Sequence, residues 1–163
     1  MDRHHNTVAT TQYIEYRSGY NYQLASDYLI RIPIYGVRVD ERYFELSSVG
    51  RLIIRQGYAW DGASGPVVDT RSVMRASLVH DVLYQMMREG LVDEDEEREI
   101  IDRLYEELVT EDVEKMYSHF QQPLRSLLVT VGKARAWCHF VGLRWFGHRA
   151  ATGAGTHRLY TSP

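Results

Sequence analysis

Hydrophobic and polar positions change their spacing near residue 70. Over residues 1–56, short runs rich in Tyr, Ile, Val and Leu are separated by Gly and acidic residues, and several alternate apolar with polar positions. Such alternation is typical of antiparallel strands with one solvated face. The pattern predicts five strands, at Gln12–Arg17, Asp27–Ile34, Tyr35–Val39, Tyr43–Leu46 and Arg51–Gln56.

From about residue 70 onward, apolar residues recur at helical spacing. The pattern predicts a loop over Gly57–Asp69 and then a helix over about Thr70–Arg88, which Gly90 ends at a C-cap-like position. An acid-led helix is predicted from residue 93 or 94 to about Thr110, because acidic side chains stabilise the positive end of the helix dipole. A new helix start is predicted over residues 110–114.

The last predicted helix spans about Leu124–Phe146, and Pro123 suits its first turn. Strands followed by helices indicate the α+β class, with an N-terminal antiparallel β-sheet and a C-terminal half of three or four helices. A chain of 163 residues is short enough for one domain. We therefore expect a single domain, 1–163, that divides into a β-rich part (1–56), a Gly-rich loop (57–69), a helical part (70–147) and an extended tail (148–163).

Composition narrows the classes of protein. Cys138 is the one cysteine, which excludes an internal disulfide and a Cys-rich metal site. The N-terminus shows no signal-peptide pattern, and no apolar run reaches the length of a transmembrane helix. We therefore expect a protein that is made in the cytoplasm and has no membrane-spanning helix.

The net charge of −3 hides an asymmetry along the chain. Residues 88–115 hold thirteen acidic and four basic residues, whereas residues 121–163 hold six basic and no acidic ones. We favour the interpretation that the two segments neutralise each other within one fold. The alternative is that the basic end binds an anionic partner such as nucleic acid, lipid headgroups or an acidic subunit.

The candidate chemistry lies in the two helices that follow the loop. His80 and Tyr84 are four residues apart and share a helix face, and Asp81 is adjacent. Imidazole can act as a general base near neutral pH, and a carboxylate can bind a hard cation. If the next helix packs antiparallel, Asp102 reaches the far nitrogen of His80 and fixes its tautomer. The structural alternative is that His80 is a hydrogen-bonded core residue and Asp102 is solvated.

The antiparallel arrangement rests on a count along the chain. His80 and Asp102 lie about eleven positions on either side of the turn near residue 91, so they are expected at similar heights. Two carboxylates close to one imidazole would repel each other, so we also expect a cation or a basic side chain nearby.

The preceding loop holds Gly57, Gly62 and Gly65, whose backbone freedom would let carbonyl or amide groups converge on a ligand. Asp61 is a candidate second carboxylate. Ser64 lies outside any Gly-x-Ser-x-Gly pattern, which argues against a nucleophilic serine. The alternative is that the loop only connects a strand to a helix.

Two stretches carry a family resemblance. Gly57-Tyr58-x-x-Asp61-Gly62-Ala63-Ser64-x-Pro66, followed by Ala76-x-x-x-His80-Asp81-x-Leu83-Tyr84, resembles the phage and prophage family known as domain of unknown function 1353, over roughly residues 45–147. The resemblance implies a bacteriophage protein but no settled activity. From it we expect a virion-associated structural protein of the tail or tail tip, made in the host cytoplasm and built on a hydrolase-like domain. It would contact other phage structural proteins through its C-terminal helix and tail.

A more distant likeness concerns mechanism. A glycine-rich loop, a His-Asp-x-x-Tyr helix and a carboxylate on the next helix are similar to phospholipase A2 enzymes, including the disulfide-free type of viral capsids. The likeness implies that His80 activates water, that Asp102 and Tyr84 support it, and that Asp81 binds calcium. The alternative function is thus an active metal-dependent hydrolase, lipid- or cell-wall-directed. Its expected ligand is a divalent cation, calcium rather than zinc, at Asp81 and Asp61, and its expected partner is anionic lipid or the cell envelope rather than nucleic acid.

Overall fold

The computed structural model describes residues 16–17, 22–62 and 71–146. The chain forms two compact units, Met1–Asp61 and Gly62–Pro163. The described part of the first unit contains antiparallel sheets and that of the second contains helices, so the predicted α+β class is confirmed. The expectation of a single domain stays a prediction.

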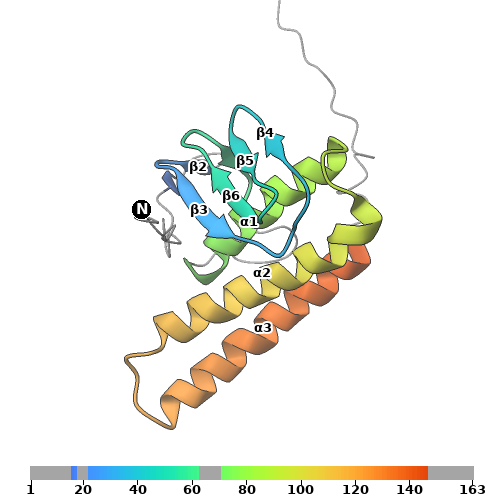
Figure 1. Cartoon of the computed structure of the whole chain (residues 1–163). Helices are drawn as coiled ribbons and strands as arrows, with labels where there is room; N and C mark the ends of the chain where they lie inside the picture. The colour runs from blue at the N-terminus through green and yellow to red at the C-terminus, as the bar shows by residue number, and fades with distance from the viewer. Residues whose placement is uncertain (1–15, 18–21, 63–70, 147–163) are drawn as a thin grey trace, which may run out of the picture. The chain divides into compact units, whose positions relative to one another are not determined.

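A four-stranded sheet forms most of the first unit. Its strands are β3 (Tyr28–Arg31), β4 (Val39–Asp40), β5 (Phe44–Leu46) and β6 (Arg51–Ile54), in the spatial order β3-β6-β5-β4 with every neighbouring pair antiparallel. Figure 1 shows β3, β6 and β5 side by side. Burial alternates along β3, β5 and β6, as expected for a sheet with one buried face.

The register of these strands aligns the buried residues in two rows. Ile54 pairs with Tyr28 on one side and with Phe44 on the other, and Leu52 pairs in the same way with Ile30 and Leu46. All six side chains are buried. Cross-strand pairs of aromatic and branched residues are the unit of sheet stabilisation, so these rows form the core of the first unit.

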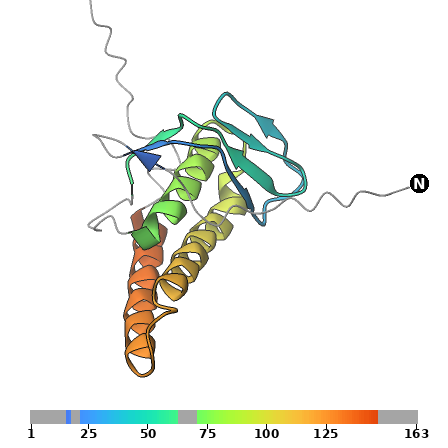
Figure 2. The same ribbon diagram turned by 90° about the vertical axis from the view of Figure 1, so that its left-hand side faces the viewer.

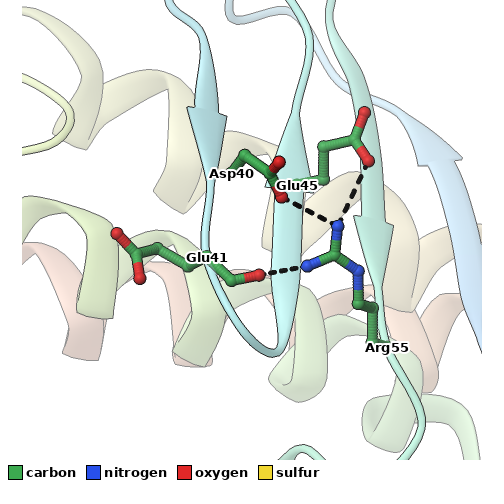
Figure 3. A network of polar contacts seen from close by, with 4 residues as sticks. All are labelled: Asp40, Glu41, Glu45 and Arg55. Carbon is green, nitrogen blue, oxygen red and sulfur yellow. Dashed lines mark hydrogen bonds and ion pairs between the residues drawn. The ribbon is translucent and has the colours of Figure 1, made fainter.

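A polar network joins the hairpin of β4 and β5 to the end of β6. The Arg55 guanidinium contacts Asp40 Oδ1 at 2.8 Å and Glu45 Oε2 at 3.4 Å, and it donates a further hydrogen bond to the carbonyl oxygen of Glu41 (Figure 3). Opposite charges on neighbouring strands favour this register.

A second, three-stranded sheet has the order β1-β2-β7 and is also antiparallel. Its strands are β1 (Tyr16–Arg17), β2 (Tyr22–Leu24) and β7 (Ala59–Trp60). Strands β2 and β7 were not predicted, and β7 falls inside the predicted loop over residues 57–69. These strands span only two or three residues, too few to show a period, and their hydrogen bonds connect distant parts of the chain.

Three helices make up the described part of the second unit: α1 (Arg71–Arg88), α2 (Glu94–Met116) and α3 (Leu124–Phe146). Helix α2 packs against both α1 and α3. Figure 1 and Figure 2 show α2 and α3 side by side and antiparallel, joined at one end by a short connection. None of the described helices combines the length and apolar character needed to cross a membrane.

Two predicted boundaries are wrong. Helix α2 continues through residues 110–114 rather than starting anew, because its buried stripe continues past Thr110 to Val113. Of the predicted strand Tyr35–Val39, only Val39 lies in a strand, where β4 begins. Residues 12–15 of the first predicted strand and the predicted tail, 148–163, lie outside the described residues.

Candidate functional site

The structure brings together three of the predicted site residues. His80 and Tyr84 lie on α1 and Asp102 lies on α2. His80 Nε2 lies 3.2 Å from Asp102 Oδ1, and the Tyr84 hydroxyl donates a hydrogen bond to the same oxygen at 2.8 Å. The predicted contact between His80 and Asp102 is therefore confirmed, whereas its catalytic role stays a prediction.

The connection between α1 and α2 explains why these residues meet. Gly90 adopts a left-handed conformation, with φ of +70°, and the amide of Leu91 donates to the carbonyl of Met86 at 2.9 Å. This C-cap ends α1 and turns the chain. Asp93 then caps α2 by accepting hydrogen bonds from the amides of residues 95 and 96. With so short a turn, positions equally far from it lie opposite each other.

Two tyrosine rings restrict the imidazole. The Tyr84 ring stacks on the His80 ring with centroids 4.0 Å apart, and the Tyr105 ring meets it edge-on at 5.5 Å. All three side chains are buried. Because the ring is held by aromatic contacts and by Asp102, the orientation of its two nitrogens is fixed.

Burial also sets the protonation of the site. His80 is 5% exposed and Asp102 is fully buried. Burial lowers the pKa of His80 below 6.5, against the opposing effect of the Asp102 hydrogen bond and charge, and the positive charge of Arg88 lowers it further. The imidazole is thus neutral at pH 7. A carboxylate can only accept, so Nε2 carries the proton and Nδ1 is left with a lone pair.

Tyr84 keeps its proton and remains a donor. Burial and the nearby Asp102 carboxylate raise the pKa of Tyr84, because both disfavour a phenolate. A hydrogen bond that the Arg98 guanidinium donates to the Tyr84 oxygen acts in the opposite direction. The predicted basic side chain near the site is therefore present as Arg98, beside Tyr84.

The predicted metal ligands, Asp81 and Asp61, belong to different units of the chain. Asp81 is half-buried on α1, whereas Asp61 is exposed at the end of the first unit. Within residues 16–17, 22–62 and 71–146, no group of three or more His, Cys, Asp or Glu side chains is placed to hold a metal ion. The divalent cation and its ligands stay a prediction.

The glycine loop is described only in part. Gly57 and Gly62 have positive φ values of 94° and 89°, conformations that favour glycine, as the loop prediction implies. Ser64 and Gly65 lie outside the described residues.

A second polar cluster between α1 and α2 was not predicted. The buried Arg75 guanidinium lies 2.8 Å from Glu111 Oε2 and 2.9 Å from Asp112 Oδ1, and its Nε donates to Asp112 Oδ2 at 3.1 Å. Burial raises the pKa of Asp112, and Arg75 opposes that shift. Counting from residue 91 would place Arg75 opposite Glu107. The observed partners lie about one turn further along α2, and the long Arg75 side chain reaches them.

Comparison with known proteins gives no relative: no family model, curated protein or solved structure matches this chain. The resemblance to domain of unknown function 1353 and the likeness to phospholipase A2 therefore stay predictions.

Proposed function

We propose that this protein is an ester hydrolase in which His80 activates a water molecule. The observation that carries the proposal is the buried contact of His80 Nε2 with Asp102 Oδ1, which Tyr84 supports through the same oxygen. A neutral imidazole whose second ring nitrogen has a lone pair is the state that a general base requires. The likeness to phospholipase A2 suggests a lipid ester as the substrate.

Each of the three residues has a defined part in the reaction. His80 Nδ1 would take a proton from water as the oxygen attacks the ester carbonyl carbon. When the tetrahedral intermediate collapses, the same proton would pass to the departing alcohol oxygen. Asp102 would stabilise the imidazolium that forms between these steps, and Tyr84 would hold the carboxylate in place.

The test is fatty-acid release from phosphatidylglycerol vesicles, with calcium or with a chelator. We expect turnover by the native protein and a loss of about 10²- to 10⁴-fold in His80→Gln, the usual contribution of a general base. The matched control is His119→Gln, because His119 is exposed and should leave turnover unchanged. Equal turnover in both variants, or no turnover by the folded native protein under either condition, would contradict the proposal.

The second candidate function is a virion-associated component of a phage tail or tail tip. It is favoured by the exposed apolar residues Leu127, Val131 and Trp137 on α3, since apolar side chains left exposed by the chain can contact other proteins. The two functions are compatible, because a tail protein can carry an enzyme. Mass spectrometry of purified phage particles tests the second function: a stoichiometric copy supports it, and absence from the particle contradicts it.

A further inference from the structure

Helix α3 has apolar residues on two sides, and α2 covers only one. On the covered side, Gly132 approaches so closely that an added Cβ would lie 2.4 Å from Val113 Cγ1. Lys133 also binds Glu114 of α2 there, at 2.6 Å. On the other side, Leu124, Leu127 and Val131 are 47–61% exposed.

The exposed positions follow a heptad pattern. Spacings of three and four residues alternate through a set that we call the α3 seam: Leu124, Leu127, Val131, Ala134, Cys138 and Val141. Leu124, Leu127, Val131, Ala134 and Cys138 are exposed and Val141 is half-buried. At a rise of 1.5 Å per residue the seam is about 26 Å long. Apolar residues with this spacing form the contact line of paired helices, so the seam is an interaction surface.

The positions of the charged residues on α3 indicate which kind of partner binds the α3 seam. Among the described side chains of α3, the charged ones are Arg125 and Lys133, and both act on Glu114 of α2. The seam itself carries no charge, so it offers little attraction to anionic lipid or nucleic acid. An uncharged apolar stripe is complementary to a copy of itself, since no like charges have to meet along it.

The sequence of the seam fits a copy that runs antiparallel. With the two-fold axis between Val131 and Ala134, Leu124 meets Val141 of the second copy, Leu127 meets Cys138 and Val131 meets Ala134. Every layer then combines a larger with a smaller side chain, which keeps the distance between the helices constant. A parallel pair would instead place leucines against leucines at one end and small residues together at the other.

We propose that the α3 seam is a homodimer interface, in which two copies of this chain pair their α3 helices antiparallel about a two-fold axis between Val131 and Ala134. Each α2 then lies on the outer side of the pair. The contact is isologous, as in most soluble dimers, and its closed symmetry prevents further growth. The proposal is independent of the activity proposed for His80.

Analytical ultracentrifugation across a concentration series tests the dimer. We expect Val131→Asp to raise the dissociation constant by about tenfold or more, because it introduces a charge into a central layer. Val49→Asp is the matched control, since Val49 is 64% exposed against 60% for Val131 but lies in the first unit. A native protein that remains monomeric throughout would overturn the proposal, and so would one that binds phosphatidylglycerol vesicles only as a monomer.

Disulfide formation tests the antiparallel register. In Leu127→Cys, the new thiol faces Cys138 of the second copy, so oxidised glutathione should link the two chains. In the native protein the two Cys138 thiols are about 16 Å apart along the helix axis and should not form a bond. Val49→Cys gives the background of random collisions. Linkage of the native protein through Cys138, or no linkage of Leu127→Cys above that background, would contradict the proposed register.

Discussion

At the scale of single residues, Asp102 differs from its acidic neighbours. The segment 88–115 holds thirteen acidic residues, and Asp102 is the one that is fully buried. It shares a helix face with Tyr105 and Val109, three and seven positions further on, which are also buried. The period of the apolar stripe accounts for the burial of Asp102. Its partner His80 was predicted from the positions of the two residues on either side of the turn near residue 91.

The pKa of His80 gives the folded state a defined dependence on pH. Well above pH 6.5 the imidazole is neutral in both the folded and the unfolded chain, so it adds no pH dependence there. Below pH 6.5 His80 is protonated in the unfolded chain before it is protonated in the folded chain, since burial lowers its pKa. The free energy of unfolding should therefore fall as the pH is lowered from 6.5 towards the folded-state pKa, by at most about 1.4 kcal/mol per pH unit for one proton.

Urea unfolding at a series of pH values measures this dependence. His80→Gln should lose this part of the slope, because its amide does not titrate and can still donate to Asp102. His119→Gln should keep it, since His119 is exposed. Identical slopes in the native protein and His80→Gln would show that His80 is not the group responsible.

At the scale of helices and strands, prediction succeeded for segments long enough to repeat their apolar pattern several times. Helix α3 has the predicted bounds, Leu124–Phe146, and α1 ends at the predicted residue, Arg88. The capping signals at Gly90 and residue 93 are local, so they could be read from sequence. Strands β2 and β7 were missed because two or three residues carry no detectable alternation.

The close approach of α2 and α3 gives a prediction for Gly132. An added Cβ would overlap Val113, whose branched side chain has little room to move, so Gly132→Ala should destabilise the protein by about 1–3 kcal/mol. Gly142→Ala is the matched control on the same helix. Its Cβ meets no described atom within 4 Å, so the better helix propensity of Ala should stabilise the protein by up to about 1 kcal/mol.

Thermal unfolding of both variants compares the two effects. Equal stabilisation by the two substitutions would show that α2 and α3 are not in contact at Gly132. Restored stability in Gly132→Ala combined with Val113→Ala would locate the overlap at that pair, because the double variant removes the opposing methyl groups.

At the scale of the whole molecule, the charge asymmetry has a partial explanation. Lys133 of the basic segment binds Glu114 of the acidic segment and, together with Arg125, lowers the pKa of that carboxyl. Neutralisation between the two segments is thus present at this pair. The two proposed surfaces lie in different places. The His80 site lies between α1 and α2, whereas the α3 seam lies on the side of α3 that faces away from α2.

The sequence predicted which residues meet at the site, but not the arginine side chains around them. Spacing placed His80, Tyr84 and Asp102 together because the turn at residue 91 is short and helix geometry is regular. Arg98 and Arg75 were not assigned roles, since the reach of a long side chain is not set by the register of its helix.

The central claim is that His80 acts as a general base held by Asp102, and the pH dependence of kcat/KM tests it most directly. The native protein should lose activity on the acid side with a pKa below 6.5, since protonation of His80 removes the base. In Asp102→Asn that pKa should fall further, because the carboxylate that raises it is lost, and the plateau should drop by about 10²- to 10⁴-fold. An unchanged plateau and acid limb in Asp102→Asn would contradict the account.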